Sequence, residues 1–309
     1  MSQKERVNLV FLLTVTVYIG LSFVVSSLPI RMPFAVNILV SQLGLVLVPA
    51  LFAFQSGYTP AELGIKKLPF RAVVLIIVFS YTLQPVLTFL NALSQCFVDT
   101  PTTSQIISAA DRIGFVEMFL LVAVTPAVLE EFVYRGIFFQ SYSEMAVLPG
   151  AVLSGLLFGV MHGNLNQFFY AFFMGFAFSM VVYATGSLLS SMLMHLVING
   201  TSTVLLYLLP KLTESLGAEG ESLSAMAAEA QELTVSGVLR TYLLPAVFGL
   251  VLSVMVYRAI VSVCHRNEQL KAALSEKGKG KAFLGFFTLP LVAGCLCMIV
   301  LMVASELLG

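Results

Sequence analysis

Nine long apolar runs constrain how this chain can fold more than any other feature of its sequence. They cover residues 7–28, 34–55, 70–98, 114–141, 147–163, 165–185, 187–209, 238–264 and 282–308. A helix needs about 20 apolar residues to cross the hydrocarbon core of a bilayer. Only 10% of the residues are charged, whereas soluble domains carry about 25%. We therefore expect an all-α, polytopic membrane protein with eight to nine transmembrane helices.

The charges between the runs predict the orientation of the protein. The run at 7–28 is too long for the apolar part of a signal peptide and lacks an A-x-A-like cleavage site before Arg31, so we expect a retained helix. Cytoplasmic loops are enriched in lysine and arginine. A cytoplasmic N-terminus and an outer C-terminus place most basic residues, including those of the loop 265–281, on the cytoplasmic side. Short outer loops favour a bacterial plasma membrane.

The same pattern divides the chain into four parts. We expect N-terminal transmembrane helices (1–113), a helical core (114–209), an acidic extramembrane insertion (210–237) and C-terminal transmembrane helices (238–309). Within the insertion, residues 224–233 are predicted to form an amphipathic helix on the outer face, serving as a connector or as a lid. The four cysteines lack the paired spacing of a zinc site and are expected to be small apolar core residues.

Three charged residues stand close together inside the apolar run 114–141. Glu130, Glu131 and Arg135 lie within six residues, although a charged side chain at the bilayer centre costs roughly 2.5–3.5 kcal/mol. Glu131 and Arg135 are four residues apart, a spacing at which an acid and a base pair on one helix face. This pairing would leave Glu130 available for chemistry. Pro126 removes a backbone hydrogen bond from the same helix and is expected to kink it.

Two of the three histidines also fall in apolar runs. If the runs 114–141 and 147–163 form an antiparallel hairpin, Glu130 and His162 lie at similar depth and face each other. The run 187–209 begins on the same side and brings Asn199 to that layer. His195 and Asn199 share one helix face because they are four residues apart, and Phe158 and His162 have the same spacing.

These groups are sufficient to hydrolyse a peptide bond without a covalent intermediate. A glutamate and a histidine can activate a water molecule as general base, and a histidine with an asparagine amide can donate hydrogen bonds to an oxyanion. The signature H-E-x-x-H is absent, both aspartates lie outside the runs, and Ser154 has no G-x-S-G element around it. A structural polar network between helices is the alternative. A transporter ranks last, because no second copy of the charged segment exists.

Three short motifs together resemble one family. Glu130-Glu131-Phe-Val-Tyr-Arg135 matches EExxxR, Phe158-Gly-Val-Met-His162 matches FxxxH, and His195-Leu-Val-Ile-Asn199 matches HxxxN. This ordered set resembles the CAAX protease and bacteriocin-processing (CPBP, or Abi) family, which includes the type II prenyl-protein endopeptidase. The resemblance implies an eight-helix core that opens towards the cytoplasm and one membrane leaflet, with a four-helix catalytic core. It implies that Glu130 and His162 activate water and that His195 and Asn199 stabilise the oxyanion. It implies supporting roles for Glu131, Arg135 and Phe158.

The resemblance leaves the cofactor and the substrate open. We favour a metal-free glutamate-type endopeptidase, because His195 with Asn199 suits an oxyanion site better than a ligand set. The alternative is a Zn²⁺ enzyme with Glu130, His162 and His195 as ligands, since catalytic zinc is usually held by three protein ligands and water. A non-catalytic immunity or scaffold protein is the third reading. The expected partners are membrane lipid and a peptide or protein substrate, either prenylated or a leader peptide. The neutral net charge excludes nucleic acid.

Overall fold

The computed structural model describes residues 1–29, 32–98, 112–215 and 233–308. Every regular element in these ranges is a helix, so the all-α prediction is confirmed for the part of the chain described. Among the described residues, seven helices are long and apolar enough to cross a membrane. They are α1 (Gln3–Ser26), α2 (Phe34–Gln55), α3 (Phe70–Gln95), α9 (Leu165–Thr185), α10 (Leu188–Ser215), α12 (Val235–Val263) and α15 (Leu289–Leu308). The chain is a polytopic integral membrane protein.

The other two predicted spans are also helical, but neither is a single α-helix of the required length. The run 114–141 forms consecutive helical segments that alternate between α- and π-helix: α5 (Phe115–Phe119), η1 (Leu120–Val124), α6 (Thr125–Glu131), η2 (Phe132–Phe139) and α7 (Gln140–Ser143). The run 147–163 forms α8 (Val147–Met161), which has 15 residues. Its length of about 22 Å is short of the roughly 30 Å hydrocarbon core. Most side chains of α8 are buried by other helices instead.

Three other expectations are corrected or fall outside the described residues. The run 282–308 is not one helix, because α14 (Lys279–Phe286) ends before Thr288 and α15 begins after it; α13 (Asn267–Ser275) precedes both. The amphipathic helix expected at 224–233 lies almost wholly outside the described residues. All four cysteines are free thiols, but only Cys295 is buried in the core; Cys96 and Cys264 are partly exposed and Cys297 is exposed.

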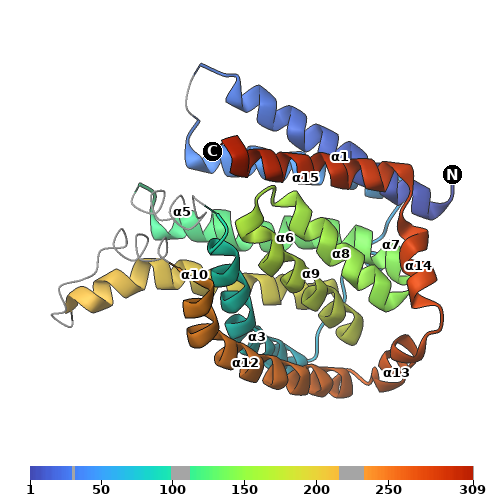
Figure 1. Cartoon of the computed structure of the whole chain (residues 1–309). Helices are drawn as coiled ribbons and strands as arrows, with labels where there is room; N and C mark the ends of the chain where they lie inside the picture. Colours follow the sequence, from blue (N-terminus) through green and yellow to red (C-terminus); the bar gives the residue numbers. More distant parts are fainter. Residues whose placement is uncertain (30–31, 99–111, 216–232, 309) are drawn as a thin grey trace.

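The first and last described helices lie side by side and run in the same direction (Figure 1). The N-terminal end of α1 is joined to the last two residues of α14, the helix just before α15, by hydrogen bonds from Lys4 Nζ to the carbonyl oxygen of Gly285 (2.7 Å) and from Asn8 Nδ2 to that of Phe286 (2.7 Å). The buried hydroxyl of Tyr142, at the end of the helical run Phe115–Ser143, donates to Asn8 Oδ1 at 2.6 Å. The N-terminus and the start of α15 therefore lie on the same side of the bundle.

The pair α8 and α9 packs closely because glycines face each other. A Cβ atom on Gly155 would lie 2.7 Å from the carbonyl oxygen of Phe172, and one on Gly175 would lie 2.8 Å from the Cα of Gly155. Real Cβ atoms do not come so close, so only glycine allows this approach. The close crossing fixes the position of Phe158 and His162, which follow Gly155 along α8.

Candidate active site

Pro126 and Asn199 are connected through the backbone of the helical run. Proline has no N–H, so the carbonyl of Val122, four residues earlier, lacks its usual α-helical donor. Asn199 Nδ2 of α10 donates a hydrogen bond to that carbonyl at 3.0 Å. Val122 belongs to the π-helical segment η1, and Thr125 Oγ1 donates to the carbonyl of Leu120 in the same segment at 2.8 Å. The irregular helix thus holds the Asn199 carboxamide in place and leaves its second N–H for another acceptor.

Glu131 is the centre of a fully buried polar cluster. Its Oε1 accepts hydrogen bonds from Arg135 Nη1 at 2.8 Å and from His195 Nδ1 at 2.9 Å. Glu131 and Arg135 have no exposed surface, and His195 is 2% exposed. The ion pair predicted from the four-residue spacing is therefore present. Because Nδ1 of His195 is engaged by the carboxylate, Nε2 is the ring nitrogen left for other contacts.

Aromatic rings lie close to the Arg135 guanidinium. Its Cζ lies 4.6 Å from the ring centroid of Phe158 and 5.1 Å from that of Phe178. Among the described residues, Arg135 Nε and Nη2 have no hydrogen-bond partner. The ring faces supply part of the missing stabilisation, since desolvated cation–π contacts contribute about 2 kcal/mol or more.

Phe158 also contacts both histidines. Its ring meets those of His162 and His195 edge to face, with centroids 4.9 and 6.0 Å apart. His162 is the C-cap of α8, and its Nδ1 lies 2.8 Å from the carbonyl oxygen of Phe158. A carbonyl only accepts, so Nδ1 carries the hydrogen and Nε2 of a neutral His162 is an acceptor.

One cavity brings the four sequence-predicted catalytic residues together. It has a volume of about 520 Å³, and Glu130, His162, His195 and Asn199 all line it. Glu131, Arg135 and Phe158 do not line it; they lie behind His195 and His162. The remaining wall is rich in amide and hydroxyl groups from α2, α3, α9 and α10: Ser41, Gln42, Gln84, Thr88, Asn91, Asn166, Gln167, Tyr170 and Ser202.

Glu130 has a partner that the motifs did not indicate. Gln42 Nε2 of α2 donates to Glu130 Oε1 at 2.8 Å, and only 9% of the Gln42 residue surface is exposed. The amide orientation follows from chemistry, because an ionised carboxylate only accepts hydrogen bonds. The one signal in the sequence was an isolated glutamine in an apolar run, where a buried polar side chain is expensive.

The alternative zinc set is not gathered into a metal site. Among the described residues, no group of three or more His, Cys, Asp or Glu side chains is arranged to hold a metal ion. The imidazoles of His162 and His195 each use Nδ1 for a protein contact and keep Nε2 for the cavity. Oriented imidazoles of this kind also occur in metal sites, and Oε1 of Glu130 is bound by Gln42.

Comparison with protein families identifies the region that carries this site. Residues 112–201 match the family described as type II CAAX prenyl endopeptidase Rce1-like. The segment is a domain of that family. The Rce1-like domain contains all seven residues of the three motifs, from Glu130 to Asn199. Its family is a protease family, with proteins or peptides as substrates. No curated protein and no solved structure matches the chain.

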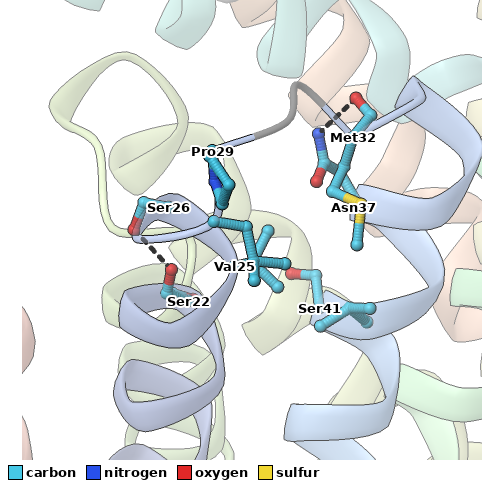
Figure 2. A pocket seen from close by; sticks show the side chains of 9 residues that line it. Ser22, Val25, Ser26, Pro29, Met32, Asn37 and Ser41 are labelled. Carbon is cyan, nitrogen blue, oxygen red and sulfur yellow. Dashed lines mark hydrogen bonds between the residues drawn. The ribbon is translucent and has the colours of Figure 1, made fainter.

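Helices outside the Rce1-like domain complete the cavity. Gln42 comes from α2, and Gln84, Thr88 and Asn91 come from α3. A second, separate pocket lies where α1 and α2 approach the connection between them (Figure 2). Its polar side chains include Ser22, Ser26 and Asn37, and it reaches Ser41 at its inner end. The α1–α2 hairpin therefore contributes to the site although no family motif lies in it.

Proposed function

We propose that this protein is an intramembrane endopeptidase that hydrolyses a peptide bond with Glu130, His162, His195 and Asn199. The observation that supports this most strongly is the single cavity that all four side chains line within the transmembrane bundle. Intramembrane ionisable groups are expensive and usually functional, and the Rce1-like domain belongs to a protease family. The fold proposed for the site is a four-helix core made of the run Phe115–Ser143, α8, α9 and α10.

Glu130 and His162 act on the water molecule. Oε1 of Glu130 is occupied by Gln42, so Oε2 is the oxygen that accepts a proton from water. Nε2 of His162 accepts the second O–H and orients the molecule. The resulting hydroxide attacks the carbonyl carbon and forms a C–O bond, while the electron pair of the C=O bond moves to its oxygen. Glu130 then returns the proton to the leaving nitrogen as the C–N bond breaks.

His195 and Asn199 stabilise the oxyanion. Asn199 donates one N–H to Val122 and offers the other to the developing negative charge. His195 donates from Nε2 when its ring carries both protons, with the carboxylate of Glu131 on Nδ1 as the opposite charge. Fixed donors aimed at an oxyanion each contribute about 10²–10³ in rate. Glu131 and Arg135 are supporting residues that act through His195.

The decisive experiment is peptide cleavage by the purified protein. A panel of prenylated C-terminal peptides, leader peptides and unmodified peptides is incubated with the protein in mixed micelles, and products are followed by mass spectrometry. Glu130→Gln should abolish cleavage, because an amide cannot accept the proton. The matched control is Glu117→Gln, which changes an exposed glutamate of the same helical run. Full activity of Glu130→Gln would refute the assignment.

A chelator arm of the same assay tests the metal question. The metal-free mechanism predicts that incubation with a strong chelator, followed by its removal, leaves the rate unchanged. Loss of activity that zinc restores would favour the zinc enzyme. Absence of cleavage across the panel, combined with tight binding of one peptide, would favour the non-catalytic scaffold.

A further inference from the structure

Gln42 has one half of its carboxamide unused. Its Nε2 donates to Glu130, but among the described residues its Oε1 is buried without a hydrogen-bond partner. A buried acceptor left unsatisfied costs about 1–3 kcal/mol. Gln42 is also held in place by its contact with Glu130, so its oxygen cannot turn away to find another donor. A donor other than the described residues is therefore expected at this oxygen.

A small cavity adjoins Gln42 on the side of α1. Its volume is about 60 Å³, and its walls include Tyr18, Leu45, Phe158 and Met161. Four residues, Ser41, Gln42, Glu130 and His162, line both this cavity and the large one. They form a wall between the two spaces. A water molecule needs about 10–15 Å³ of such volume and two to four polar partners, so the small cavity has room for a few waters.

Ser41 connects this small cavity to the pocket between α1 and α2. It lines the α1–α2 pocket, the small cavity and the large cavity. Figure 2 shows its hydroxyl pointing from α2 toward α1, where it donates to Tyr18 Oη at 3.2 Å. Polar groups thus continue from the end of the α1–α2 hairpin to the back of the Glu130–His162 wall.

We propose that the small cavity is a water site that supplies the hydrolytic water, and that Gln42 is its positioning residue. Gln42 Nε2 holds the Glu130 carboxylate, and Gln42 Oε1 accepts a hydrogen bond from a water queued behind the attacking one. Water then reaches Glu130 from the α1 side while the peptide occupies the large cavity. This inference rests on the proposed function, because it assigns a role to water beside Glu130.

The kinetic test replaces Gln42 by an apolar residue of similar size. Gln42→Leu and the unbranched Gln42→Met remove both polar contacts without changing the charge. Misplacement of a catalytic group by about 1 Å can cost 10²-fold, so kcat should fall roughly 10- to 100-fold while KM stays within about twofold. The control is Gln55→Leu, which makes the same change at the exposed end of the same helix.

A second measurement detects the water without using activity. X-ray pulses generate hydroxyl radicals from bound water, and mass spectrometry locates the side chains that they oxidise. Met161 is 6% exposed and lines the small cavity, so its oxidation reports water in that cavity. We expect Met161 to be labelled in the unaltered protein, in Glu130→Gln and in Gln55→Leu, and to lose most of its label in Gln42→Leu.

The two proposals fail in different ways. If Glu130→Gln is inactive but both Gln42 variants keep full kcat, the role of Gln42 is wrong and the hydrolase assignment stands. An increase in KM alone would show that Gln42 contacts the peptide, and equal labelling of Met161 in all variants would remove the water site. Full activity of Glu130→Gln would overturn the hydrolase itself, whatever the labelling shows.

Discussion

Replacing Arg135 by methionine should strongly destabilise the protein. Arg135 and Glu131 have no exposed surface, and their side chains are 2.8 Å apart. The substitution leaves the Glu131 carboxylate buried with His195 as its only partner among the described residues. Removing one member of a buried pair costs about 3–5 kcal/mol. Methionine still fills much of the space beside Phe158 and Phe178, so the loss should reflect mainly the uncompensated charge.

The assay is unfolding of the purified protein by SDS titration in mixed micelles. We expect Arg135→Met to lower the free energy of unfolding by about 3–5 kcal/mol, and the exposed control Arg240→Met to change it by less than about 0.5 kcal/mol. The double variant Glu131→Leu/Arg135→Met should recover part of the loss, because it removes the buried charge but leaves His195 Nδ1 without its acceptor. Two results would contradict this reasoning. One is a free energy of unfolding for Arg135→Met within about 1 kcal/mol of the unaltered protein. The other is a double variant whose loss of unfolding free energy equals the sum of the losses in the two single variants.

Two further substitutions test the packing around the site. Pro126→Ala restores a backbone N–H that competes with Asn199 for the carbonyl of Val122. The kcat for peptide cleavage should therefore fall about tenfold with KM unchanged. An unchanged kcat would show that this contact does not position Asn199. Gly175→Ala puts a Cβ 2.8 Å from the Cα of Gly155 and should cost about 1–3 kcal/mol in the same SDS titration, whereas Gly20→Ala, which meets nothing within 4 Å, should be neutral.

Helix boundaries were predictable where local chemistry ends a helix. The predicted run 165–185 coincides with α9. Asn164 caps the start of this helix, because its Oδ1 accepts a hydrogen bond from the backbone N–H of Gln167 at 2.8 Å, and Gly186 ends the helix with a φ of 67°. The run 282–308 was predicted as one helix and the structure divides it. Pro290, the second residue of α15, has no N–H to donate to the Phe286 carbonyl four residues earlier, so a local signal for the break was present in the sequence. Asn8 donates to that carbonyl and to Thr288 Oγ1 at 2.7 and 2.8 Å, and this contact across nearly the whole chain is not visible in local hydropathy.

In the candidate site, too, local spacing predicts some contacts and long-range packing determines others. The Glu131–Arg135 pair follows from helical periodicity, and the meeting of Glu130 with His162 follows from an antiparallel hairpin with a short turn. The contact between Gln42 and Glu130 depends on how α2 packs against the helical run 115–143, which sequence spacing does not specify. The Pro126 signal was visible, but its consequence was not a simple kink: the carbonyl that it leaves free is the one that Asn199 binds.

The partners of the two adjacent glutamates explain why the chain needs both. Consecutive residues of a helix point about 100° apart, so Glu130 and Glu131 meet different neighbours. The Arg135 ion pair and the His195 hydrogen bond both end on Glu131, whereas Glu130 is met by the neutral amide of Gln42 at the wall of the cavity. In the proposed mechanism, Glu131 therefore orients His195, and Glu130 is the carboxylate that exchanges a proton with water.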